Sequence, residues 1–173
     1  MDELARDVLT LARNTLLVNL RFFDAALSQF SLEMRPEGAM ATDGRTLICG
    51  TLDVLRSYRD EHAAPARDYL HLVMHCVYRH MYQKREVEPR LWNLACDMAV
   101  ERAISGLELL AVSVRREGKQ AELIAPIQEK VGMPTAEKLY RWLLSAGLPE
   151  ERLAELESFF RADDHSLWYR HAA

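Results

Sequence analysis

Apolar residues recur every three to five positions along most of the chain, a spacing that predicts a mainly helical protein. Residues 3–30 contain no glycine or proline, and their apolar positions follow one face of a helix, so they predict one long amphipathic helix. Further helices are predicted over 51–61, 66–83 and 89–105. The last of these is predicted to stop at Gly106.

Two short segments depart from the helical pattern. Residues 31–35 alternate like a strand, and residues 46–49 form a short apolar run. The pair Asp43-Gly44 lies just before that run and is a hairpin signal, because glycine tolerates the positive φ that the turn requires. A small hairpin or a pair of edge strands is therefore predicted. Residues 107–114 are rich in β-branched and large apolar side chains and predict either a strand or a buried extended piece.

The last third of the chain again has the helical spacing. After a polar linker at 115–118, three helices are predicted over residues 119–131, 135–145 and 150–161. The predicted fold class is α+β, mainly α, with a central helix pair, a small β-hairpin or sheet and a C-terminal helical subdomain. We expect residues 1–115 to form the core, and residues 116–173 to form a helical extension packed on the same domain.

The composition narrows the functional classes. With 173 residues, 49% of them hydrophobic, the chain is long enough to bury a sizeable core. A net charge of −4 gives no broad basic field, so a nucleic-acid partner is not expected. Cys49, Cys76 and Cys96 contain no C-x-x-C pair, which favours reduced thiols. No signal-peptide pattern and no long apolar run occurs, so a cytoplasmic protein without a membrane segment is expected.

His71 and His75 are the first candidates for chemistry. Histidines four residues apart on a helix lie about 40° apart around its axis, which is the spacing of a two-histidine zinc site. In a zincin, the motif H-E-x-x-H also supplies a glutamate that acts as general base on the metal-bound water. Leu72 occupies that position here and cannot accept a proton.

Polar side chains on two predicted helices suggest a third ligand. The first helix carries a narrow polar stripe, made of Asp68, His71, His75 and Arg79. The next helix carries a line at four-residue steps, made of Asn93, Asp97 and Glu101. Buried polar stripes need partners, so the two lines are expected to face each other. Asp97 is then the preferred third ligand, and Asn93, Asp68 and Arg79 are candidate outer groups or alternative ligands.

Two other histidines have weaker claims. His80 lies about 140° from His75 on a continuous helix, so it reaches a metal only if the chain turns after Tyr78. His165 follows two aspartates and is interpreted as a turn residue or cap, with a ligand as the weaker alternative. If the ligands lie elsewhere, His165 with Asp163 or Asp164 is the next place to look. A metal-free hydrogen-bond network around His71 and His75 also fits the pattern.

Three blocks of sequence carry a resemblance to a known family. They are residues 41–55 (ATDGRTLICGTLDVL), 68–80 (DYLHLVMHCVYRH) and 91–104 (LWNLACDMAVERAI). The chain resembles a bacterial family of metallopeptidase-like domains that precede a von Willebrand factor A-like domain. Its members read approximately T-D-G-x-x-L, H-E-V-L-H-x-x-x-x-H and L-W-N-x-A-x-D in this order. The resemblance covers about residues 35–107 closely.

The resemblance implies a zincin-like fold, a zinc cofactor, and His71, His75 and Asp97 as ligands, with His80 as an outer group or alternative ligand. It also implies a protein partner, either an AAA ATPase or a von Willebrand A-like protein. Because Leu72 replaces the glutamate, the expected function is a degenerate peptidase domain that serves as a metal-binding or scaffold module. Two alternatives remain open. One is an active metal-dependent peptidase or RNase whose base is Asp68, Glu86 or Glu101, and the other is a metal-free helical interaction module.

Overall fold

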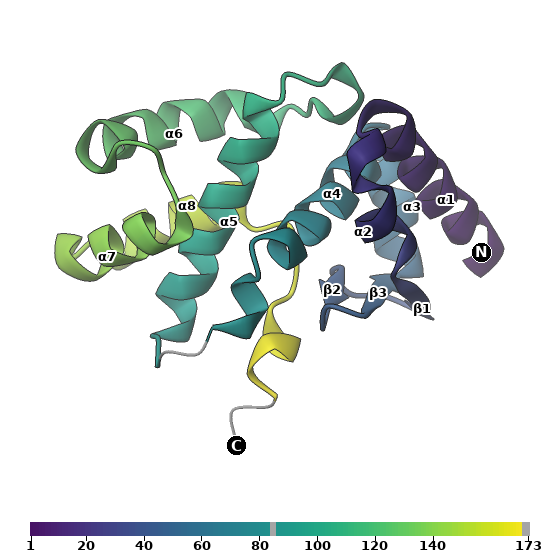
Figure 1. Ribbon diagram of the computed structural model, residues 1–173, viewed down its shortest axis with the longest axis horizontal. Helices are drawn as coiled ribbons and strands as arrows, with labels where there is room; N and C mark the ends of the chain where they lie inside the picture. The colour runs from purple at the N-terminus through teal and green to yellow at the C-terminus, as the bar shows by residue number, and fades with distance from the viewer. Residues whose placement is uncertain (84–85, 171–173) are drawn as a thin grey trace. The chain divides into compact units, whose positions relative to one another are not determined.

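Eight α-helices, four short 3-10 helices and a three-stranded sheet make up the computed structural model, which describes residues 1–83 and 86–170 (Figure 1). This confirms the predicted fold class, which is α+β and mainly α. The chain divides into two units. The first contains residues 1–82, 109–114 and 162–173, and the second contains residues 83–108 and 115–161. No helix within the described residues is long and apolar enough to cross a membrane.

The first unit is built on four helices: α1 (Asp2–Asn19), α2 (Asp24–Ser28), α3 (Thr51–Asp60) and α4 (Ala64–Val77). One face of α1 packs on α3 and α4 and buries Ala5, Val8, Leu9, Ala12 and Leu16. The predicted single helix over 3–30 is wrong, because the chain leaves helical geometry at Leu20 (φ −131°, ψ 63°). Leu20 is buried there, so the break turns an apolar side chain into the core before the 3-10 helix η1 (Arg21–Phe23).

A small mixed sheet completes this unit. Strand β3 (Thr46–Gly50) lies between β1 (Ser31–Arg35), which runs parallel to it, and β2 (Ala41–Thr42), which runs antiparallel. The predicted hairpin is β2–β3. At its turn Gly44 has a φ of 93°, and Asp43 Oδ1 accepts hydrogen bonds from the backbone N–H groups of Arg45 and Thr46. The local turn chemistry of Asp43-Gly44 therefore produced the expected structure.

The second unit is a set of helices: α5 (Pro89–Gly106), α6 (Arg116–Val131), α7 (Ala136–Ala146) and α8 (Glu150–Phe160). Helix α5 packs on α7, α8 and α6. Its first turn is capped by Glu88, whose carboxylate accepts from the N–H groups of Arg90 and Leu91. The Arg90 guanidinium also bonds the carboxylates of Glu150 and Glu157, which ties α5 to α8.

The units do not follow the expected division into 1–115 and 116–173. Helix α5 belongs with the C-terminal helices on which it packs, while the end of the chain returns to the first unit. Residues 109–114 also belong to the first unit. They form neither the strand nor the buried extended piece that was predicted, but an irregular segment that contains the 3-10 helix η3 (Leu110–Val112). Arg67, fully buried on α4, donates a hydrogen bond to the Val112 carbonyl.

The packing at Gly50 generates a stability prediction. A Cβ on Gly50 would lie 2.3 Å from the backbone oxygen of Gly38, whereas a Cβ on Gly118 would meet nothing within 4 Å. We expect Gly50→Ala to lower the free energy of unfolding by about 1–3 kcal/mol. Gly118→Ala, inside α6, should be neutral or stabilising by up to about 1 kcal/mol. Chemical denaturation checks both, and equal stabilities of the two variants would contradict the prediction.

Candidate metal centre

Helix α4 holds two histidines in the interior of the first unit. Pro65 lies in its first turn, where no backbone N–H is needed, and His71 and His75 are both fully buried. Their neighbours Leu72 and Val73 are also fully buried, so this part of the helix is enclosed on every side. The imidazoles therefore depend on protein groups for their hydrogen bonds.

The C-terminal segment supplies those groups. Asp164 N–H donates to the Met40 carbonyl at 2.8 Å, and Asp164 forms an isolated parallel bridge with Ala41, next to the hairpin. Side chains alternate along an extended chain, so the residues on either side of Asp164 point the same way. Asp163 and His165 are both buried, and both side chains lie against the α4 histidines.

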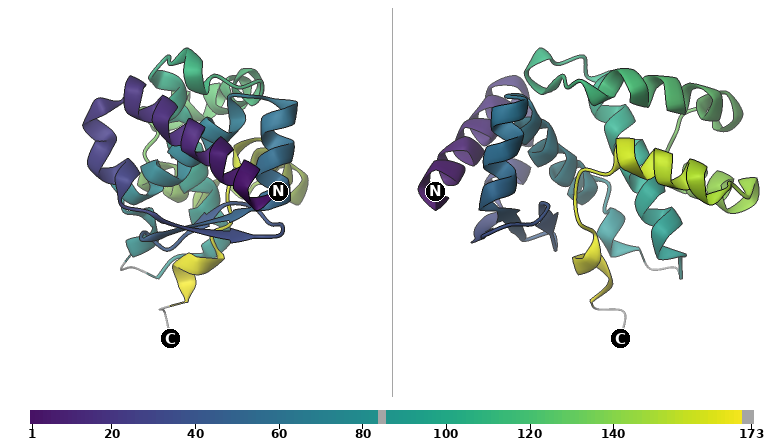
Figure 2. Two further views of the ribbon diagram at one scale, coloured as in Figure 1. Left: turned by 90° about the vertical axis from the view of Figure 1, so that its right-hand side faces the viewer. Right: turned by 180° about the vertical axis from the view of Figure 1, so that it is seen from behind.

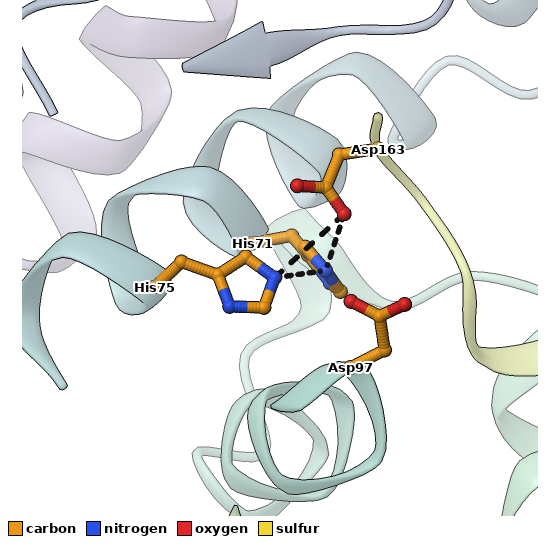
Figure 3. A group of neighbouring side chains, drawn as sticks. All are labelled: His71, His75, Asp97 and Asp163. Carbon is orange, nitrogen blue, oxygen red and sulfur yellow. Dashed lines mark hydrogen bonds and ion pairs between the residues drawn. The ribbon is translucent and has the colours of Figure 1, made fainter. Parts of the chain in front are cut away.

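Three imidazole nitrogens converge on one carboxylate oxygen. Asp163 Oδ1 lies 3.3 Å from His71 Nε2, 3.7 Å from His75 Nε2 and 3.0 Å from His165 Nε2. The Nε2 atoms of His71 and His75 are 2.8 Å apart. Figure 3 shows the His71, His75 and Asp163 side chains pointing toward a common centre, and it also labels Asp97, which comes from α5 of the second unit.

His80 contacts the far side of the His75 ring. Helix α4 ends at Val77, and Arg79 adopts a left-handed φ of 59°, so the predicted helix to residue 83 is too long. The turn brings His80 back, with its Nδ1 atom 2.9 Å from His75 Nδ1. The prediction that His80 points away from His75 is therefore wrong. His80 nevertheless lies where an outer partner is expected, because it contacts Nδ1 of His75, whereas the cluster lies at Nε2 of the same ring.

Trp168 packs over the same side chains. It lies in the 3-10 helix η4 (Ser166–Tyr169), and its ring centroid is 4.8 Å from that of His75 and 4.4 Å from that of His165, both edge-on. His165 precedes η4 but makes no capping hydrogen bond with its side chain. The backbone of His165 does occupy the predicted turn position, because its carbonyl accepts from the Trp168 N–H, while its buried side chain lies in the cluster.

The histidines control the charge of Asp163. Burial alone raises the pKa of its carboxyl, but the charges of His75 and His165 and hydrogen bonds from His165 and His71 outweigh burial. The pKa of Asp163 is therefore held well below its usual value. The residue is an ionised carboxylate in a site closed to water.

The donor set fits a metal ion. Ligand atoms about 2.0–2.2 Å from a tetrahedral zinc ion lie roughly 3.3–3.6 Å apart. His71 Nε2, His75 Nε2 and Asp163 Oδ1 are separated by 2.8, 3.3 and 3.7 Å, which brackets that range. Without a metal, His71 Nε2 cannot at once donate to the carboxylate and accept from His75, since a neutral imidazole nitrogen does only one. Two histidines and a carboxylate form a common zinc ligand set.

Asp97 remains a prediction as a ligand. It is buried on α5, in the second unit, and offers a ligand atom of the same kind as Asp163. Asn93 is half-buried on the same helix. Glu101, a candidate base, is fully buried and bonds Arg116 and Gln120 of α6.

The other predicted outer residues differ in exposure. Asp68 is half-buried on α4, and Glu86 is exposed. Arg79 lies beyond the end of α4, exposed, with its guanidinium 5.8 Å from the centre of the Tyr82 ring. The proposed polar stripe thus ends at His75. Residues 84 and 85, in the segment between the predicted helices over 66–83 and 89–105, lie outside the described residues.

Asp163 is the main residue that the preferred interpretation of the sequence did not include. Eighty-eight positions separate it from His75, so no local spacing connects them. The only signal was local: two aspartates directly before a histidine, in an aromatic segment close to the end of the chain. That signal predicted only an alternative site. In the structure, its residue Asp163 lies against the α4 histidines.

Comparisons with known proteins add no relative. The chain matches no protein-family model, no curated protein and no solved structure. The resemblance in the three sequence blocks therefore remains an expectation.

The position of Trp168 yields a prediction. Trp168→Ala should lower the free energy of unfolding by about 3–5 kcal/mol, because it leaves a cavity against His75 and His165. Trp142, only half-buried on α7, is the matched control and should cost less when replaced by alanine. Urea denaturation followed by far-UV circular dichroism checks this. A smaller loss for Trp168→Ala than for Trp142→Ala would contradict the packing described here.

Proposed function

We propose that this chain is a degenerate zincin-like domain that binds a zinc ion in a closed site and acts as a metal-stabilised scaffold. The observation that carries the proposal is the convergence of His71 Nε2, His75 Nε2 and Asp163 Oδ1 within a fully buried cluster. Neutral imidazole and carboxylate donors favour zinc over calcium or magnesium, which prefer oxygen ligands alone. Asp97 is proposed as the fourth ligand.

The outer residues have separate proposed roles. A histidine that binds metal through Nε2 carries its proton on Nδ1 and donates it to an acceptor. His80 Nδ1, 2.9 Å from His75 Nδ1, is suited to be that acceptor and so to select the tautomer of His75. His165 Nε2 lies 3.0 Å from Asp163 Oδ1 and is proposed to orient that carboxylate. With these roles, His71 Nε2, His75 Nε2 and Asp163 Oδ1 are left to bind one ion.

Two features argue for a scaffold rather than a hydrolase. Leu72 replaces the glutamate that serves as general base in zincins, and its side chain is fully buried. Structural zinc sites are closed, whereas catalytic sites keep one coordination position open to water. The proposed ligands His71, His75 and Asp163 have no exposed surface. When bound, the metal supplies a cross-link between α4 and the C-terminal segment.

The proposed setting follows from the resemblance alone. Domains of the similar family work beside von Willebrand A-like domains and AAA ATPases, so a protein partner of that kind in the cytoplasm is proposed for this chain. A scaffold of this type needs a stable surface rather than a substrate cleft. The closed cluster would stabilise such a surface, because its proposed ligands join two segments that are distant in the sequence.

Metal analysis tests the proposal directly. Protein purified without a histidine tag should contain about one equivalent of zinc, measured by elemental analysis after dialysis. Asp163→Asn and His71→Ala should lower zinc affinity by more than about 100-fold in a chelator competition, because each removes a ligand. His80→Ala should cost only about 10–100-fold, as expected for an outer partner. Asp97→Ala should severely weaken binding if Asp97 is the fourth ligand.

Asp164→Asn is the matched control, because it changes an adjacent aspartate. The Asp164 carboxylate accepts from the Ser166 N–H, and an asparagine oxygen can replace it. Full zinc content in Asp163→Asn, or an equal loss in Asp164→Asn, would place the ligands elsewhere. Absence of zinc from the wild-type protein under saturating conditions would favour the metal-free interaction module.

A second prediction concerns activity. The zinc-loaded chain should show no chelator-sensitive turnover of casein or structured RNA, because removing a positioned general base typically costs ~10²–10⁴-fold. The measurement is product release with and without a chelator, with a known metallopeptidase and a known RNase as positive controls. Turnover that requires metal and disappears in His71→Ala would favour the hydrolase alternative, with its base among Asp68, Glu86 and Glu101.

A further inference from the structure

Helix α1 carries a stripe of exposed apolar side chains on the face that does not pack on the rest of the first unit. Leu4, Leu11 and Val18 are 58%, 52% and 72% exposed, and Phe22 just beyond the helix is 76% exposed. Figure 2 (left) shows α1, in purple, running across the near side of the first unit. A single exposed leucine is ordinary, but a row of apolar side chains along one helix marks an interaction surface.

The spacing of the stripe suits another helix. Leu4, Leu11 and Val18 are seven residues apart, and positions separated by seven drift by only about 20° around a helix. They therefore form a nearly straight seam of the kind that pairs two helices. The buried face of α1, which includes Val8 and Leu16, is already occupied by α3 and α4, so the seam is a second face.

The charges at the two ends of the seam point to a second copy of the chain. The first turn of α1 is acidic, with Asp2 and Glu3, and Arg21 follows the far end of the helix. Neither Glu3 nor Arg21 forms an ion pair with a residue that the structure describes. Two copies of α1 packed antiparallel would place Glu3 of each copy near Arg21 of the other. A parallel pair would instead bring like charges together.

We propose that the chain self-associates through α1 as a two-fold symmetric dimer, with two antiparallel α1 helices that cross near Leu11. In this arrangement Leu11 meets its own copy at the axis, Leu4 faces Val18 of the second copy, and Glu3 faces Arg21. The interface is isologous, as in most dimers, because one surface serves both partners. It lies on residues distinct from the proposed metal ligands, so the dimer does not depend on the metal proposal.

Sedimentation equilibrium over about two decades of concentration tests the dimer. The wild-type mass should rise from that of one 19.9 kDa chain toward that of two. Leu11→Glu should weaken association at least about tenfold, because it places two carboxylates at the axis. Leu144→Glu is the matched control, since Leu144 is 53% exposed on α7, and it should associate like wild type. Val18→Glu provides a second seam variant if Leu11→Glu is poorly folded by circular dichroism.

Charge exchange tests the orientation. Glu3→Arg and Arg21→Glu should each weaken association, and an equimolar mixture of the two variants should restore it, because the heterodimer regains both pairs. The proposal is overturned if the wild type stays monomeric, if Leu11→Glu associates as well as Leu144→Glu, or if the mixture gives no recovery. Association of a different protein with the stripe in place of a second copy would also overturn it. Zinc content of Leu11→Glu, measured in parallel, should equal that of wild type.

Discussion

The interaction on which the first unit depends is the burial of the Asp163 carboxylate among imidazoles. An ionised carboxylate without compensation costs many kcal/mol in the interior, so it persists there only with close donors or a cation. The Nε2 atoms of His71 and His165 lie 3.3 and 3.0 Å from Asp163 Oδ1, and the pKa of Asp163 is held well below its usual value. The Asp163 carboxylate therefore joins α4 to the C-terminal segment, which is far from it in the sequence.

That point explains the course of the chain. Residues 162–170 return to the first unit after the second unit has been completed, and the bridge between Asp164 and Ala41 aligns them beside the hairpin. Trp168 then covers His75 and His165 with an aromatic surface. Closing so long a loop costs conformational entropy, and buried polar and aromatic contacts offset that cost. A metal ion in the cluster would add a further cross-link at the same place.

The proposed metal site is a buried polar cluster, whereas the proposed dimer interface is an exposed apolar face of a helix. The cluster has polar groups hidden from water, where Leu72 contributes only apolar packing. The α1 stripe has apolar groups open to water, where Leu11 and Val18 lack a covering layer. A closed interior site suits rigidity, and an uncovered helix face suits association. The two proposals together assign the action of the chain to its surface rather than to a substrate cleft.

The sequence by itself determined the features that depend on neighbours along the chain. Helical periodicity predicted α3, α5, α7 and α8 closely, whereas α6 begins at Arg116, inside the predicted linker. Asp43-Gly44 predicted the hairpin, and the four-residue spacing placed His71 and His75 on one side of α4. Contacts between distant segments decided the rest. The break at Leu20 follows from burial of its side chain, and the left-handed turn at Arg79 accompanies the return of His80 to His75. Asp163 became the partner of those histidines only through folding, because no local pattern encodes a contact across so long a separation.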